Sequence, residues 1–165
     1  MRGKKRRKVS ILLAACIGIV ILLLFLPHLF QPSDWDLVKE FQEIVKTQDA
    51  ERLYDLCHPR WRSRYDRETA IKLLREGLKI LPRQFNIAPH YQEHRSPEEI
   101  ARFYKAVPND PFIKPFTITV SKDFKSGRWY LSGDLFYEFL IVQYGFAKGN
   151  AIWRSWVIAL KGVRK

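Results

Sequence analysis

The sequence predicts an α+β domain behind an N-terminal membrane-spanning helix, and three features carry this prediction. An uncharged apolar run occupies residues 9–26, directly after six basic residues. Apolar residues recur at helical spacing through 34–81, whereas apolar and polar residues alternate in the last third of the chain. Helices followed by antiparallel strands are typical of an α+β fold, with the helices packed on one face of a curved sheet.

The apolar run is long enough to cross a bilayer as one helix. At a rise of 1.5 Å per residue, its 18 residues span about 27 Å, close to the thickness of the hydrocarbon core. We expect a basic cytoplasmic tail at 1–8, a transmembrane helix with its interface at 9–30, and an extracytoplasmic α+β domain at 31–165.

Charge sets the predicted direction of this span, because basic flanks stay in the cytoplasm. The topology-setting residues are Arg2, Lys4, Lys5, Arg6, Arg7 and Lys8. We therefore expect a single-pass protein of the plasma membrane, with its N-terminus inside and its C-terminal domain outside. Two alternatives stay open. One is a cleaved signal peptide, and the other is a lipoprotein signal, because residues 13–16 (LAAC) resemble a lipobox around Cys16.

The outer domain is moderately basic. The formal net charge of the chain is +12, but beyond the tail 23 basic residues face 17 acidic ones, a net of +6. This excess suits an anionic membrane surface, an acidic cell-wall polymer or an acidic partner protein, and it does not predict nucleic-acid binding. Cys57 is the only cysteine beyond the apolar run, so we expect a buried thiol and no disulfide within the domain.

Four helices are predicted in the first part of the domain. Ser33, Asp49 and Asp66 are suitable N-caps for helices over 34–46, 50–57 and 67–81. Ser96, followed by proline and two glutamates, predicts a fourth helix that ends near residue 106.

Alternating patterns predict the strands. The expected strands cover 116–121, 129–138 and 151–160, and residues 84–88 can add a short one.

This order of elements resembles one known superfamily. The helical pair 34–57, the break at His58-Pro59, the helix 67–81 and the strand that opens with residues 127–131 (GRWYL) are similar to the nuclear transport factor 2-like, cystatin-like superfamily. The resemblance covers nearly the whole outer domain, although a helix at 97–106 departs from it. It implies a cone-like fold whose mouth holds a ligand, is catalytic or is empty. Some members are membrane-tethered scaffolds, including a component of type IV secretion systems.

One sequence motif suggests a metal site. His90, Glu93 and His94 spell H-x-x-E-H, the pattern of inverted zinc peptidases, but flanking prolines leave no room for the helix that this pattern needs. On a strand the two histidines would lie about 13 Å apart. We expect polar loop residues here, and no metal or cofactor.

Two further groups are candidate sites. The first is an anion patch for lipid headgroups or a cell-wall polymer, formed by Arg60, Arg62, Arg64 and Arg67. Its alternative is a solvated link between helices, with Trp61 in the core. The second is a pocket on the predicted central strand, lined by Tyr130, Asp134 and Tyr137, in which a buried Asp134 could act as a base.

The sequence favours a non-catalytic function, because it holds no Ser-His-Asp order, Gly-rich phosphate loop or C-x-x-C motif. We expect a membrane-anchored binding or scaffolding domain whose partners are the bilayer and a membrane or envelope protein. The alternative is a small-molecule-binding or isomerase-like domain that uses a cone pocket.

Overall fold

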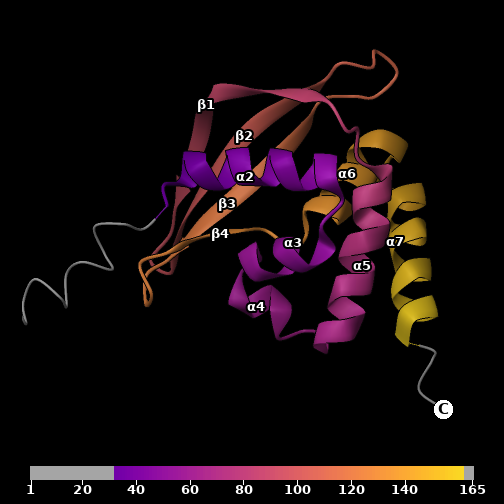
Figure 1. Ribbon diagram of the computed structural model, residues 1–165, viewed down its shortest axis with the longest axis horizontal. Helices are drawn as coiled ribbons and strands as arrows, with labels where there is room; N and C mark the ends of the chain where they lie inside the picture. The colour runs from indigo at the N-terminus through magenta and orange to yellow at the C-terminus, as the bar shows by residue number, and fades with distance from the viewer. Residues whose placement is uncertain (1–31, 162–165) are drawn as a thin grey trace, which may run out of the picture. The chain divides into compact units, whose positions relative to one another are not determined.

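The computed structural model describes residues 32–161, and these form an α+β domain with six helices and a four-stranded antiparallel sheet (Figure 1). The helices are α2 (Asp34–Thr47), α3 (Ala50–Leu56), α4 (Pro59–Arg62), α5 (Arg67–Ile80), α6 (Leu135–Tyr144) and α7 (Phe146–Lys161). The strands are β1 (Phe85–Arg95), β2 (Glu99–Pro108), β3 (Phe116–Asp123) and β4 (Trp129–Leu131).

The predicted tail at 1–8 and membrane span at 9–30 lie outside the described residues. The topology-setting residues lie there too: Arg2, Lys4, Lys5, Arg6, Arg7 and Lys8. Among residues 32–161, no helix combines the length and the apolar character that a membrane crossing requires. The membrane topology therefore stays a prediction.

The first three predicted helices are confirmed, and their caps form as expected. At the start of α2, the Ser33 hydroxyl accepts the Asp36 N–H at 3.1 Å, and the Asp36 carboxylate accepts the Ser33 N–H in return. Asp49 and Asp66 accept backbone N–H groups at the starts of α3 and α5. The apolar stripes of α2 and α5 face the core.

The sheet is a meander in the order β1-β2-β3-β4, with every neighbouring pair antiparallel. β2 pairs with β3 without interruption, from Glu99 opposite Asp123 to Ala106 opposite Phe116. The register of β1 against β2 is irregular between Ile87 and Tyr91, a stretch that includes a proline. The strand predicted at 116–121 is confirmed as β3.

The predicted helix at 97–106 is wrong, because this segment is β2. The expected helix start does make hydrogen bonds, since the Ser96 hydroxyl accepts the N–H groups of Glu98 and Glu99. These bonds close the turn between β1 and β2 instead, and the aromatic and β-branched residues that follow suit a strand. β1, the strand that pairs with β2, is longer than predicted. The short strand expected at 84–88 is present, but β1 continues to Arg95.

The two strands predicted at 129–138 and 151–160 are also wrong. β4 ends after three residues, and the rest of both segments belongs to α6 and α7. Both segments hold apolar residues at strand spacing and at helical spacing. In α6, buried residues fall at helical spacing at Leu135, Phe136, Phe139 and Leu140. When apolar residues occupy all sides of a segment, their spacing in the sequence does not distinguish a buried helix from a strand.

One core joins the helices to the sheet. α2 crosses one face of the sheet and packs against β3 and β4, α6 packs on β3, and α7 packs on α5 and α6 (Figure 1). The largest fully buried side chains include Tyr104, Phe41 and Phe136. Cys57 is buried among them as predicted, and burial raises the pKa of its thiol to about 12.

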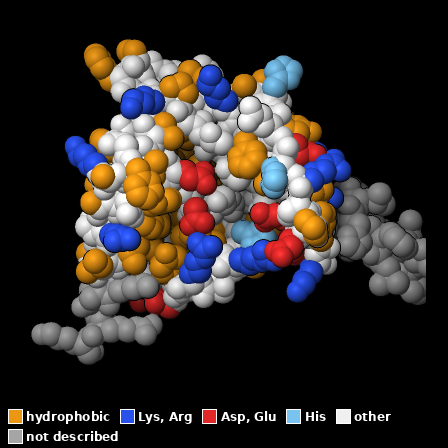
Figure 2. Space-filling view, turned by 180° about the vertical axis from the view of Figure 1, so that it is seen from behind, with side chains coloured by type: hydrophobic (Ala, Val, Ile, Leu, Met, Phe, Trp, Pro, Cys, Tyr) orange, Lys and Arg blue, Asp and Glu red, His pale blue; other side chains and the backbone are white. Residues whose placement is uncertain are grey.

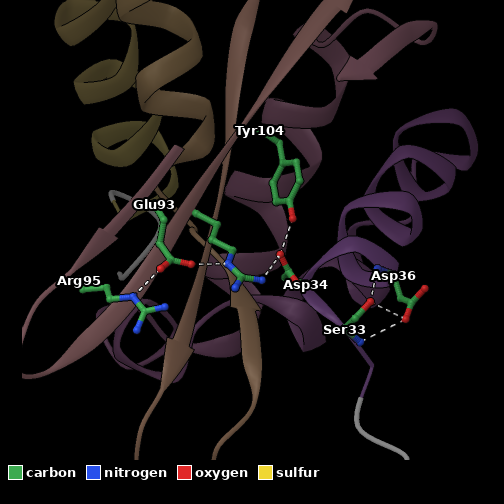
Figure 3. Close-up of polar contacts among 7 residues, drawn as sticks. Ser33, Asp34, Asp36, Glu93, Arg95 and Tyr104 are labelled. Atoms are coloured by element: carbon green, nitrogen blue, oxygen red, sulfur yellow. Dashed lines mark hydrogen bonds and ion pairs between the residues drawn. The ribbon is translucent and has the colours of Figure 1, made fainter. Parts of the chain in front are cut away.

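A polar network fastens the start of α2 to the sheet (Figure 3). The buried carboxylate of Asp34 accepts a hydrogen bond from the Tyr104 hydroxyl and pairs with the Arg102 guanidinium at 2.8 Å. Arg102 also binds Glu93 at 2.8 Å. Its guanidinium lies over the Tyr91 ring at 4.4 Å and the Trp129 ring at 4.6 Å.

Glycine permits the close crossing of α6 and α7. Gly145 joins the two helices with a φ of 80°, which other residues rarely adopt. A β-carbon at Gly149 would lie 2.7 Å from the backbone carbonyl oxygen of Leu140 in α6. The absence of a side chain at Gly149 therefore sets the distance between these helices.

Replacement of Arg102 by Leu should lower the free energy of unfolding by about 2–4 kcal/mol, because it leaves the Asp34 carboxylate buried without its cation. The double variant Asp34→Asn/Arg102→Leu should recover part of this loss. Denaturant titration of the full chain in mild detergent, followed by tryptophan fluorescence, measures both. A loss no larger than that of Arg75→Leu, an exposed control on α5, would contradict the expectation.

Gly149→Ala should destabilise the protein although alanine is the better helix former. Helix propensity alone would stabilise α7 by about 1 kcal/mol. The new β-carbon must instead displace the Leu140 backbone, and we expect a net loss of about 1–3 kcal/mol. Thermal unfolding of the full chain decides the sign, and a raised melting temperature would show that the crossing can relax.

Candidate functional site

The four arginines of the predicted anion patch lie on α4, on the link after it and at the start of α5, and two of them, Arg62 and Arg67, share a partner in the ring of Tyr54. Arg60 lies 3.5 Å from Glu98, Arg64 lies 3.1 Å from Asp134, and Arg67 lies 3.9 Å from Glu51. Arg62 lies over the Tyr54 ring. Three of the four charges are thus shared with carboxylates of the chain, and the patch does not converge on one point.

Trp61 lies in the core, as the alternative interpretation of this segment predicted. Its indole packs against Gly133, where an added β-carbon would lie 2.1 Å from the ring. The segment around Trp61 therefore links the helices to the end of β4. The sequence motif alone does not distinguish this structural role from anion binding.

The three residues of the predicted pocket do not meet. Tyr130 on β4 contacts His58 edge-on at 5.2 Å between ring centroids. Asp134 precedes α6 and pairs with Arg64, whereas Tyr137 on α6 contacts Trp153 of α7. The predicted pocket requires one long strand that carries all three residues. The chain instead turns into α6 after β4, and this turn separates the three side chains.

The H-x-x-E-H residues lie on β1, in extended backbone. Glu93 of this motif is engaged by Arg95 and Arg102. In the described part of the chain, no group of three or more His, Cys, Asp or Glu side chains is placed to hold a metal ion.

A groove of about 470 Å³ crosses the sheet between the middle of β1 and the start of β3. Figure 2 shows the corresponding face of the molecule as hollowed. The groove is open to solvent, its polar lining includes His90, Gln92 and Lys105, and no Asp or Glu lines it.

Four exposed hydrophobic side chains lie on the β2–β3 loop and where α6 meets α7. We call this surface the distal corner, and it comprises Phe112, Val142, Tyr144 and Phe146. Phe112 is 92% exposed and stands on the loop between β2 and β3, at the upper right in Figure 1. In the reversed view of Figure 2, hydrophobic side chains project from the upper left. Large exposed apolar patches are typical of interaction surfaces.

Hydrogen bonds hold the Phe112 loop against the end of α6. The Gln143 side chain accepts the Lys114 N–H at 2.9 Å and donates to the Lys114 carbonyl at 2.8 Å. The Lys114 ammonium donates to the Val142 carbonyl at 3.3 Å. Within the loop, the Asp110 carboxylate accepts the Phe112 N–H at 2.9 Å. The exposed ring is therefore presented by a fixed backbone.

The charges around the distal corner are mostly positive. Lys114 stands behind the loop, and the ammonium of Lys148 lies 5.3 Å from the centre of the Tyr144 ring. From residue 139 to residue 165 the sequence contains no acidic residue. The corner is thus an apolar surface with a basic rim.

Sequence reasoning missed the distal corner. The available signal was the stretch 108–115 (PNDPFIKP), in which two apolar residues stand among turn-forming ones. That signal predicts a loop, but only the fold places it beside the end of α6. No protein-family model, curated protein or solved structure matches this chain.

Glu138 lies on α6, whereas the sequence predicts it on a central strand with Tyr130, Asp134 and Tyr137. Its carboxylate accepts a hydrogen bond from the Thr119 hydroxyl at 3.4 Å, on the side of β3 that α6 covers. Burial, together with the nearby charge of Asp134, raises the pKa of this carboxyl above its ordinary value.

Glu138→Gln should therefore stabilise the protein at pH 7 and have little effect at pH 4. A raised pKa in the folded state means that the contribution of Glu138 is fully present below its unfolded pKa of about 4.5 and is lost as the pH rises through the folded value. Melting temperatures of the full chain at both pH values measure this. The exposed control Glu51→Gln should change neither, and a destabilisation at pH 7 would contradict the expectation.

Proposed function

We propose that this chain is a single-pass membrane-anchored docking protein, with a cytoplasmic N-terminus and an extracytoplasmic domain that binds a partner protein through the distal corner. The proposal is supported by the apolar run after six basic residues and by the exposed aromatic rings of the distal corner, of which Phe112 stands on a hydrogen-bonded loop. Aromatic anchors that stand clear of the surface supply most of the binding energy in many interfaces.

The position of the distal corner suits a tethered protein. α2 begins beside Arg102, near the start of β2, whereas the Phe112 loop follows the end of β2. Arg102 to Pro108 spans six residue steps, or about 20 Å of extended strand. The corner is thus held away from the point where α2 begins, where a partner can reach it. Confinement to a thin layer raises the effective concentration, so a modest contact area suffices.

The chemistry of the corner describes its partner. Phe112 and Phe146 require an apolar cleft, and the basic rim with Lys114 and Lys148 favours carboxylates around that cleft. We therefore propose a membrane or envelope protein whose apolar cleft has an acidic edge.

Photo-crosslinking in intact membranes tests this function. A crosslinker at position 112 or 146 should capture the same partner, whereas a crosslinker at Phe124, an exposed phenylalanine on the turn after β3, should not. Phe112→Ser should reduce co-purification of that partner about tenfold or more. Gln143→Ala should also reduce it, because the loop loses two hydrogen bonds while the phenylalanine remains.

Two outcomes would contradict the proposal. The first is an equal capture from positions 112 and 124, which indicates unspecific contact. The second is no capture at either corner position, together with a small molecule that stays bound to the purified protein. That result would favour the alternative, a small-molecule-binding or isomerase-like domain that uses the groove over β1, β2 and β3.

A further inference from the structure

Hydrogen bonds to Asp123 close the turn between β3 and β4. Asp123 accepts the N–H of Ser126 at 3.0 Å through its carboxylate and the N–H of Gly127 at 2.8 Å through its carbonyl. Gly127 has a φ of 68°, in the left-handed region. Hydrogen bonds from Ser126 lower the pKa of Asp123, so its carboxylate is ionised and accepts hydrogen bonds within the turn.

The outward residues of this turn are apolar and basic. Phe124 is 49% exposed, and Lys125 and Arg128 are exposed beside it. Among residues 32–161, neither cation has an ion-pair partner. Lys122, one residue before the turn, lies over the ring of Trp129. We call Lys122, Phe124, Lys125 and Arg128 the proximal tip.

The proximal tip lies at the same end of the domain as the start of α2. Asp123 pairs with Glu99 across the sheet, and Arg102, which binds Asp34, follows three residues later on β2. The tip is therefore about 10 Å beyond Asp34 along the strands. Figure 1 shows the β3–β4 turn and the start of α2 at the same, left-hand end.

The proposed membrane anchor would bring this end near a bilayer. If residues 9–30 span the membrane, residues 31 and 32 reach at most about 10 Å before the fixed cap at Ser33. Two half-buried tryptophans, Trp35 and Trp129, lie at the same end and contact Tyr104 and Arg102. Tryptophan is enriched at the level of lipid headgroups.

We propose that the proximal tip docks on anionic phospholipid headgroups of the membrane that anchors the chain, with Lys125 and Arg128 against the phosphates and Phe124 at the acyl boundary. This inference rests on the proposed membrane anchor. The contact fixes the orientation of the domain relative to the membrane, so that the distal corner faces away from the lipid.

Spin labelling of the full chain in nanodiscs tests the contact. Phe124→Cys in a Cys16→Ser background carries the label, because Cys57 is buried and its thiol has a raised pKa. Nanodiscs contain phosphatidylcholine alone or with phosphatidylserine. With phosphatidylserine, the label at 124 should become more accessible to oxygen and less accessible to a water-soluble nickel chelate. A label placed by Phe112→Cys should stay aqueous in both.

Charge reversal supplies the matched control. Lys125→Glu/Arg128→Glu should lower the docked population at least tenfold, because each cation near an anionic surface raises the affinity for that surface about fivefold. Lys72→Glu/Lys79→Glu makes the same change in net charge on α5 and should have no effect.

The possible failures are distinguishable. A chain that does not enter nanodiscs at all would overturn the membrane anchor and the proposed function with it. A chain that inserts, but whose label at 124 stays aqueous with phosphatidylserine, would overturn only the tip. Two other results would also overturn only the tip. One is an equal change in accessibility of the label at 124 in neutral lipid, and the other is a label that soluble polyphosphate immobilises while the anionic bilayer does not.

Discussion

The guanidinium of Arg102 is the contact on which the arrangement of this domain depends. It lies between the rings of Tyr91 and Trp129 and binds the carboxylates of Asp34 and Glu93. These partners come from β1, β4 and α2, while Arg102 itself belongs to β2. One side chain therefore joins three strands to the first helix, and its two carboxylates and two rings replace the water that the cation loses on partial burial.

The two ends of the domain carry different chemistry. Near the start of α2, cations and aromatic rings surround a turn in which the Asp123 carboxylate accepts the Ser126 N–H. At the far end, aromatic and aliphatic side chains stand on a loop that α6 holds in place.

The sequence predicted α2, α3 and α5 well because their starts are locally determined. Ser33, Asp49 and Asp66 cap their helices through contacts within three residues. The errors arose where partners are distant. Residues 99–108 become a strand because β1 and β3 pair with them, and the apolar segment 135–160 becomes helical because it packs on β3 and α5. The distal corner joins residues 112 and 146, so only the fold could reveal it.

The orientation of α2 has a mechanical consequence. Its N-terminus is the point at which any pull on the chain from the preceding residues enters the domain. The helix lies along the sheet, and Asp34 is bound sideways to Arg102, while Gln42 bonds the Phe85 carbonyl further along. A force along the helix axis therefore loads these contacts together, in shear, instead of peeling them apart one after another. We expect such a geometry to resist tension better than one in which the contacts break one after another.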